Sequence, residues 1–392
     1  MIKGKGTLRQ QMMRCYLHGY ITNRHNDYNI VSHGDKYKTY KDLKVFGAKE
    51  KLIEYGMPRS LASIIVKIAP HFETILSLST CVILFLNYTL KYMYIKKTSF
   101  HNRKFFPKPN ALEKRVKDIY NSIGLSTGDL TVIDIPGQYT NYQEFPTVSV
   151  FSGISYSQLW KSFINSMLLT CFMIRKYKKD DMLFRTYSSF PFFLCFFFIE
   201  NLDDSNELVF FNHYDRWMYL FGNSHLHKTY VQHGKLWKDN ISRIKCDVAY
   251  YISPSQQNVL EYTLFDNKPE ARFRKVFDFS GEEKLKNNGR KDLLVICMCL
   301  FHDLHEKLVE RIYGKKINIY LKPHPGDNMD LYIQFQSKYP EIVILGKFDY
   351  PQVDYAISYN STLADEYEMH DIPVLKYDDI NYEEKLKEWF AE

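Results

Sequence analysis

The sequence comprises 392 residues, which is enough for two domains that each bury a core. Hydrophobic residues make up 45% of the chain and charged residues 25%, and this balance excludes an intrinsically disordered protein. Seven scattered cysteines without a CxxC pair are typical of a reducing compartment. The chain has no GxGxxG, Walker or GxSxG motif, which argues against dinucleotide, P-loop and hydrolase chemistry.

Residues 1–110 are predicted to form a mostly helical, basic N-terminal segment that ends in a proline-containing linker at 105–110. Residues 1–69 hold 13 Lys and Arg against 5 Asp and Glu, whereas the net charge of the whole chain is +7. This charge suits an anionic membrane or a phosphorylated acceptor, and without a recognition motif nucleic acid is not expected. The apolar run 78–95 leaves three roles open: a spanning helix, an interfacial helix or a buried core helix.

Residues 111–285 are predicted to form an N-terminal Rossmann-like domain. Asp215 follows one of its apolar strands, and His233 with Gly234 follows the next. A glycine directly after a histidine lets the chain turn and exposes the imidazole at the strand end. Histidine titrates near neutrality, which suits a general base. Strands are expected at 130–135, 206–212, 228–232 and 247–252, a helix at 157–177, and a buried strand or helix at 191–199.

Residues 286–392 are predicted to form a second Rossmann-like domain, because strands and helices alternate from Asp292 to the end. The polar stretch 282–291 is the expected linker before it. A strand at 317–322 breaks at Lys322-Pro323-His324-Pro325-Gly326, where a helix follows. Lys322, His324 and Gly326 are therefore expected at the carboxyl end of a strand, where open α/β sheets bind ligands.

Two hydroxyl side chains begin a later helix of this second domain. Ser361 and Thr362 follow a strand predicted at 353–358, and their hydroxyls and backbone N–H groups suit an anion. An ordinary N-cap is the simpler interpretation of the same residues. Glu366 lies one helical turn beyond Thr362 and is a candidate to reach a ribose from the same face.

Three motifs together resemble those of bacterial surface-polysaccharide transferases of the GT-B fold: Gln232-His233-Gly234, Lys322-Pro323-His324-Pro325 and Ser361-Thr362. The resemblance spans roughly residues 205–380. It is closest to capsule sialyltransferases and Kdo transferases, which use CMP-sugars, and to teichoic acid glycerophosphotransferases, which use CDP-alditols. It implies an α/β fold in which two Rossmann-like domains face a cleft, with a helical basic N-terminal extension.

The resemblance also implies roles for individual residues. It assigns His324, Ser361 and Thr362 to the phosphates of the donor nucleotide, and His233 to the catalytic base. The polysialyltransferases instead use an acid in an Asp/Glu-Asp/Glu-Gly motif, of which this chain has no clear copy. Asp215 is therefore the second candidate for the base.

The predicted function is transfer of a sugar from a nucleotide-activated donor, with a CMP-sugar favoured, to a growing capsule, O-antigen or lipooligosaccharide. Preorganised donors can stabilise a departing phosphate without a metal, the chain lacks a DxD triplet, and Asp203-Asp204 is expected to form a turn or cap. No metal or other cofactor is expected. The protein is expected in the cytoplasm, peripheral on the inner face of the cytoplasmic membrane.

Three other functions remain open from the sequence. A CDP-glycerol or CDP-ribitol phosphotransferase would build a teichoic-acid-like polymer with the same loops. A non-catalytic polysaccharide-binding or assembly protein would keep the fold without binding a nucleotide. A sugar epimerase on the same scaffold would convert a free UDP-sugar without an acceptor.

Overall fold

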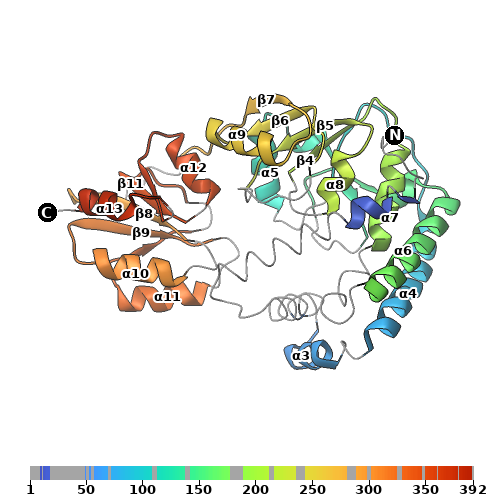
Figure 1. The fold of residues 1–392 in the computed structure, drawn as a ribbon, viewed down its shortest axis with the longest axis horizontal. Coiled ribbons are helices and arrows are strands. Elements are labelled where there is room, and N and C mark those ends of the chain that lie inside the picture. Colours follow the sequence, from blue (N-terminus) through green and yellow to red (C-terminus); the bar gives the residue numbers. More distant parts are fainter. Residues whose placement is uncertain are drawn as a thin grey trace.

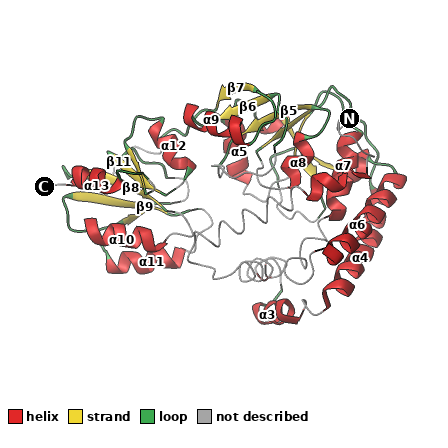
Figure 2. Cartoon of the chain, in the orientation of Figure 1, coloured by secondary structure: helices red, strands yellow, loops and turns green. Residues whose placement is uncertain are grey.

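The computed structural model contains two parallel β-sheets, of seven and five strands (Figure 1). Helices flank both sheets (Figure 2). This arrangement confirms the predicted α/β class with two Rossmann-like units. The residues that the structure describes are 9–10, 12–17, 49, 53, 57–68, 72–107, 113–136, 142–176, 189–211, 216–234, 243–279, 288–297, 302–324, 329–346, 349–359, 361–377 and 379–390.

The first sheet has the strand order β3-β2-β1-β4-β5-β6-β7, and all neighbouring strands are parallel. Its inner strands are short apolar runs, as expected where helices cover both faces of a parallel sheet. The strand bounds are β1 Lys104–Pro107, β2 Leu130–Asp134, β3 Thr147–Ser149, β4 Glu207–Phe210, β5 His227–Val231, β6 Val248–Tyr251 and β7 Glu270–Phe273.

The linker predicted at 105–110 is wrong at its start, because residues 105–107 belong to the central strand β1. This strand lies between β2 and β4, and Phe105 pairs with both Thr131 and Leu208. Phe105 and Phe106 are fully buried in two different core clusters. A four-residue strand that is buried on both faces and ends in proline lacks the alternation that marks a strand in sequence. The first sheet thus begins before residue 111.

A hydrophobic helix, α7 (Ser189–Glu200), lies in the core of the first unit. Every residue from Ser189 to Ile199 is buried, as expected for a helix that is apolar all round. The Phe192 ring packs against Tyr16 at 5.3 Å and Trp217 at 5.7 Å between centroids. The buried segment predicted at 191–199 is therefore a helix. Shorter helices of this unit are α5 Glu113–Asn121, α8 Arg216–Gly222 and α9 Pro254–Thr263.

Two long helices, α4 (Glu73–Tyr94) and α6 (Tyr156–Lys176), lie side by side at the outer side of the first unit (Figure 1). The Cys81 thiol is 3.6 Å from the Ser166 hydroxyl, and the Phe85 and Phe163 rings stack at 4.4 Å. The shorter α3 (Arg59–Ile68) precedes them. None of the helices in the described part of the chain combines the length and the hydropathy that a membrane span needs.

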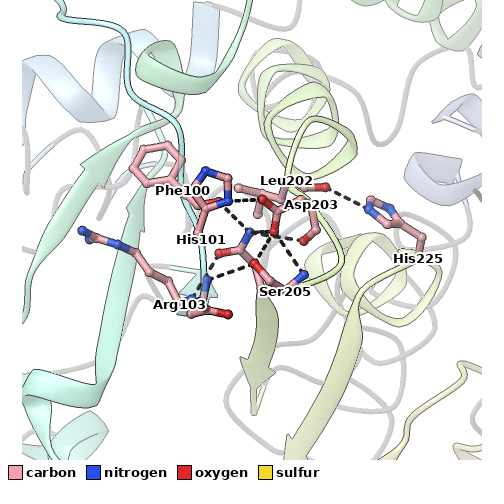
Figure 3. Close-up of polar contacts among 9 residues, drawn as sticks. Phe100, His101, Arg103, Leu202, Asp203, Ser205 and His225 are labelled. Atoms are coloured by element: carbon pink, nitrogen blue, oxygen red, sulfur yellow. Dashed lines mark hydrogen bonds and ion pairs between the residues drawn. The ribbon is translucent and has the colours of Figure 1, made fainter.

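A polar cluster at the amino ends of β1 and β4 holds these two central strands together (Figure 3). The buried Asn206 side chain donates to Asp203 at 2.8 Å and accepts from the Arg103 backbone at 3.2 Å. The Asp203 carboxylate also accepts from Ser205 and forms an ion pair with His101. The Ser205 hydrogen bonds hold the pKa of Asp203 below its usual value. Asp203 thus stabilises a turn, as predicted.

The second sheet has the strand order β10-β9-β8-β11-β12, and it too is entirely parallel. Core clusters lie on both of its faces. The strands are β8 Lys291–Ile296, β9 Ile317–Lys322, β10 Val343–Ile344, β11 Tyr355–Ser358 and β12 Val374–Lys376. The helices are α10 His302–Ile312, α11 Met329–Lys338, α12 Thr362–Glu368 and α13 Tyr382–Phe390.

Candidate active site

The three central strands of the second sheet end in one row. Lys322 of β9 pairs with Ile296 of β8, which pairs in turn with Ser358 of β11. From β8 the chain proceeds to β9 and β10 on one side, whereas β11 and β12 lie on the other. Ligands of open α/β sheets bind outside the carboxyl ends of the strands where the order reverses in this way. The loops after Lys322 and after Ser358 therefore flank the expected ligand position.

Lys322 is buried at this edge of the second sheet. The residue is 5% exposed, and its Nζ donates to the Gly346 carbonyl at 2.6 Å. The same Nζ lies 4.6 Å from the centroid of the Tyr350 ring. Burial lowers the pKa of Lys322 to about 8, because a charged ammonium is costly to desolvate, and nearby Asp349 opposes part of this shift. Lys322 therefore loses its charge at a lower pH than an ordinary lysine does.

His324 lies two residues beyond the end of β9, and its side chain is exposed. Pro323, between Lys322 and His324, is buried and fixes the path of the chain. The imidazole is thus presented to solvent at the carboxyl edge of the sheet, beside the buried lysine. Gly326, the other predicted residue of this loop, lies outside the described residues.

Ser361 is the N-cap of α12, which was the simpler of the two interpretations of the sequence. Its backbone is extended, with φ −99° and ψ 142°, and its side-chain oxygen accepts from the Leu363 N–H at 3.2 Å. Because this bond uses the Ser361 oxygen only as an acceptor, the hydroxyl can still donate to a ligand. Thr362 begins the helix and is partly exposed. Because α12 has only seven residues, the hydroxyl groups matter more here than the helix dipole.

Glu366 forms a buried ion pair that the sequence did not indicate. Its carboxylate accepts from the Arg274 guanidinium, and the two side chains are 6% and 5% exposed. Burial lowers the pKa of Arg274, and the nearby Glu366 charge opposes this effect. The carboxylate predicted to reach a ribose is thus engaged with a residue from the first unit. No sequence feature signalled Arg274, because the strand before it was not predicted.

Arg274 and the residues after it join the carboxyl edge of the first sheet to the second unit. The Arg274 N–H donates to the Tyr251 carbonyl of β6 at 3.0 Å. Three residues later, the Phe277 ring stacks on Tyr350 at 4.7 Å, and its carbonyl lies 2.7 Å from His370 Nε2. Tyr350 is also the ring beneath the Lys322 ammonium. The chain that leaves the first sheet therefore contacts the candidate site of the second.

His233 lies at the carboxyl end of β5, where the sequence placed it, and is partly buried. Its ring is 4.8 Å from the Phe211 ring, which follows the neighbouring strand β4. The fully buried Gln232 fixes this turn: its side chain accepts from Ile252 N–H at 3.0 Å and donates to Gln256 at 3.0 Å. Gln232 thus holds the turn that carries His233. In the sequence, the signal for this role was a polar residue directly after an apolar strand.

The remaining predicted residue, Asp215, lies outside the described residues. His233 follows a strand of the first sheet, whereas Lys322 and Ser361 follow strands of the second, so the two predicted halves of the site belong to different units. Within the described ranges, no group of three His, Cys, Asp or Glu side chains is placed to hold a metal ion.

A cavity of about 260 Å³ opens between α10 and α11 in the second unit. Cys297, directly after β8, and Leu321 of β9 form its floor, while His305 and the aromatic Phe335 and Tyr332 line its sides. His305 Nδ1 lies 3.3 Å from the hydroxyl of another tyrosine, which follows β12. The cavity therefore adjoins the same strand ends as Lys322.

No protein-family model matches the chain, and no curated protein matches its sequence. Several solved structures are similar in chain path. TarM shares 10% identity over 72% of this chain and 86% of its own, with a TM-score of 0.38. MurG from Acinetobacter baumannii has 8% sequence identity to this chain, covers 74% of this chain and 90% of its own, and has a TM-score of 0.37. The E. coli heptosyltransferase WaaC was solved with ADP-2-deoxy-2-fluoro heptose. It has 10% sequence identity to this chain, covers 70% of this chain and 88% of its own, and has a TM-score of 0.27. These TM-scores are below 0.5, so function rests on the residues of the chain itself.

Proposed function

We propose that the protein is a glycosyltransferase that moves a sugar from a nucleotide-activated donor to a growing surface glycan or glycolipid. One observation carries this proposal: the loops with Lys322, His324, Ser361 and Thr362 flank the point where the strand order of the second sheet reverses. Cationic and hydroxyl donors at such a point suit the phosphates of a nucleotide.

In the proposed reaction, the second unit holds the leaving group. The bond between the anomeric carbon and the donor phosphate breaks, and negative charge accumulates on the phosphate oxygens. The Lys322 ammonium, the His324 imidazole and the two hydroxyls of Ser361 and Thr362 are donors that would stabilise this charge. Preorganised donors of this kind supply several kcal/mol, roughly a thousandfold in rate. We propose that the transfer needs no metal, in keeping with the absence of a DxD triplet from the sequence.

The first unit supplies the acceptor side of the proposed reaction. His233 is the preferred base, and Asp215 is the second candidate. The base takes the proton of an acceptor hydroxyl while the acceptor oxygen forms its bond to the anomeric carbon. The position of His233 at a strand's carboxyl end, on a turn fixed by Gln232, supports this assignment.

The cavity beside Cys297 is the proposed place for the nucleoside. Its aromatic and polar lining, next to the strand ends, fits a flat base with a few polar groups. A CMP-sugar is the favoured donor on the resemblance of the three loop motifs. Glu366 is proposed to position α12 through Arg274 instead of binding a ribose.

One alternative is favoured by a specific residue pair. His233-Gly234 has the style of the histidine that serves as base in teichoic acid glycerophosphotransferases. A CDP-alditol phosphotransferase would use the same loops but would transfer a phosphoalditol. The product separates the two reactions, because only the phosphotransferase leaves phosphorus in the polymer.

The proposed acceptor is a glycan or a lipid-linked saccharide, and the proposed location is the inner face of the cytoplasmic membrane. The basic N-terminal third of the sequence supports contact with an anionic surface.

A nucleotide panel tests the proposed function. The melting temperature is measured with CMP, CDP, UDP and GDP, and the best nucleotide is then supplied as sugar and alditol conjugates. We expect one cytidine nucleotide to raise the melting temperature, because binding to the folded state alone stabilises it. Release of that nucleotide from a sugar conjugate supports the glycosyltransferase. No shift with any nucleotide would favour a non-catalytic binding protein, and conversion of a free UDP-sugar would favour an epimerase.

A further inference from the structure

The outer side of the first unit carries an apolar face that the proposed transfer chemistry does not use. On α4 the exposed large residues from Ile83 to Met93 recur at three- and four-residue intervals, and Ile75 lies eight residues before Ile83, so they share one side of the helix. They include Ile75, Ile83, Leu86, Leu90 and Met93, and Met93 is 71% exposed. The stripe from Ile75 to Met93 extends for about 27 Å along the helix axis.

Helix α6 has a second apolar stripe with a strict four-residue interval. Its members are Tyr156, Trp160, Ile164, Leu168 and Phe172, and all are exposed. Each member lies close to the next, one turn along the helix, and the stripe as a whole winds gradually around α6. This stripe extends for about 24 Å.

The two stripes lie on helices that pack against each other, and together they make up the exposed apolar surface of the pair. The exposed Trp160 packs against Phe85 of α4 at 5.2 Å, and the exposed Tyr156 lies 5.9 Å from Tyr92. These contacts also fix an antiparallel arrangement, since residues near the end of α4 meet the start of α6. Figure 1 shows the pair along the outer edge of the first unit, away from the second sheet. We call this surface the α4–α6 face.

The charged residues of these helices are mostly basic. Lys91 and Lys161 are exposed next to Leu90 and Trp160 respectively. In the sequences of α3, α4 and α6 together, Glu73 is the only acidic residue, whereas the basic residues are Arg59, Lys67, Lys91, Lys161, Arg175 and Lys176. An apolar face with lysine and arginine at its margins suits the interface of an anionic bilayer.

The same charges argue against a second copy of this chain as the occupant. A two-fold contact would bring the lysine margins of both copies together, with hardly any acidic residue on these helices to pair with them. Anionic lipid headgroups neutralise such margins, while the acyl region accepts the aromatic and aliphatic side chains. Tyr156 and Trp160 are residues that favour this boundary.

We propose that the α4–α6 face docks on an anionic membrane, with both helices lying in the plane of the headgroup region. The inference rests on the proposed function only in that a lipid-linked acceptor gives the docking a purpose. Helix α6 follows the carboxyl end of β3, after the short turn at Val150–Gly153. The start of the α6 stripe is thus on the side of the first sheet that carries His233. Docking through this face places the proposed acceptor side near the bilayer surface.

Vesicle co-sedimentation of the full chain tests the proposal. The vesicles contain phosphatidylcholine alone or with about 30 mol% phosphatidylglycerol, because each basic residue near an anionic surface contributes about fivefold to binding. We expect at least tenfold tighter partition to the anionic vesicles. Ile83→Glu with Leu86→Glu, and separately Ile164→Glu with Leu168→Glu, are expected to weaken partition at least tenfold. Lys91→Glu with Lys161→Glu is expected to lower the preference for phosphatidylglycerol at least fivefold.

Ile333→Glu is the matched control, because Ile333 is an exposed isoleucine on α11 of the second unit. It should bind vesicles like the wild type. Equal partition of the wild type and the face variants would overturn the proposal. So would a concentration-dependent dimer, measured by analytical ultracentrifugation, that the same variants abolish, since a second copy would then cover the face.

The nucleotide-induced rise in melting temperature is measured on the same variants. Because the α4–α6 face lies on the first unit, the face variants should keep the nucleotide-induced rise in melting temperature while their partition to vesicles is weakened. Vesicle binding without any nucleotide response would leave the docking intact and contradict the proposed function. A nucleotide response without vesicle binding would support the proposed function and contradict the docking.

Discussion

The Arg274 guanidinium and the Glu366 carboxylate form an ion pair in which both side chains are at least 94% buried. Arg274 follows the last strand of the first sheet, and Glu366 lies on the helix that begins at Ser361 and Thr362. One buried contact therefore connects the end of the first sheet with the helix that carries the proposed phosphate donors. The two units thus contact each other next to the candidate site.

Removing one partner of this pair is expected to destabilise the protein strongly. Glu366→Gln leaves the Arg274 cation buried without a counter-charge, which costs about 3–5 kcal/mol in the free energy of unfolding. Replacing both residues, as in Arg274→Met with Glu366→Leu, should cost less than the single change. Urea unfolding followed by circular dichroism measures both values.

The exposed pair between Arg311 and Glu383 is the control for this measurement. Its side chains are 41% and 62% exposed, so Glu383→Gln is expected to change stability by less than about 1 kcal/mol. If Glu366→Gln were as mild as Glu383→Gln, the buried pair would not hold the units together.

Lys322 predicts that the stability of the protein depends on pH in the alkaline range. Its pKa in the folded protein is about 8, below the ordinary lysine value of 10.5. Between pH 8 and 10.5 the unfolded chain therefore binds more protons at this site, and its contribution makes the folded state more stable as pH rises. The slope from one such group is at most about 1.4 kcal/mol per pH unit. Urea unfolding of the wild type and of Lys322→Met across this window isolates the contribution.

The same titration should be visible in nucleotide binding. A phosphate is attracted by the protonated lysine, so the affinity of the best nucleotide is expected to fall about tenfold between pH 7 and pH 9. Lys322→Met should bind more weakly and show a flatter profile in isothermal titration calorimetry. If the affinity of the wild type depended on pH as little as that of Lys322→Met, Lys322 would not contact the phosphate.

His233 is expected to act on the rate and not on donor binding. His233→Ala should lower kcat by about 10²–10⁴-fold, the usual contribution of a general base, and leave nucleotide affinity within twofold of wild type. Steady-state kinetics with the identified donor and acceptor checks the rate. An equal loss in Asp215→Asn with normal kcat in His233→Ala would assign the base to the aspartate.

The polar cluster between β1 and β4 is expected to be structural. Asn206→Ala removes the acceptor of the Arg103 backbone N–H and the donor to the Phe100 carbonyl, which is a buried bond, and should cost about 1–3 kcal/mol. The pKa of Asp203 is lowered in the folded state, so the stability that its charged form contributes is present above about pH 4 and is lost as pH falls further. Asp203→Asn should therefore flatten the acid side of the stability profile. An unchanged profile would show that the cluster contributes nothing at low pH.

Much of the second unit was predictable because its strands and helices alternate with clear breaks. Lys322 ends β9 as expected, and Ser361 starts α12 within a residue of the prediction. The relation between the two loops could not be read from sequence, since it depends on strand order. Only the pairing of Ile296 with both Lys322 and Ser358 shows that the loops are neighbours across one strand.

The first unit was harder to predict for identifiable reasons. β1 is four residues long and β3 is three, and neither alternates in a way that marks a strand. Helix α7 is apolar on every side, so length alone could not separate it from a strand. The Arg274 contact joins residues 92 positions apart, and local patterns carry no information about such a pair.

The dissociation constant of the best nucleotide for His324→Ala tests the proposed donor site most directly. His227→Ala is the matched control, because His227 is an exposed histidine at the amino end of β5, opposite the edge that carries His233. We predict that His324→Ala weakens binding at least tenfold, as expected for loss of a hydrogen bond to a charged phosphate, and that His227→Ala has no effect. Binding by His324→Ala within twofold of the wild type would contradict the account.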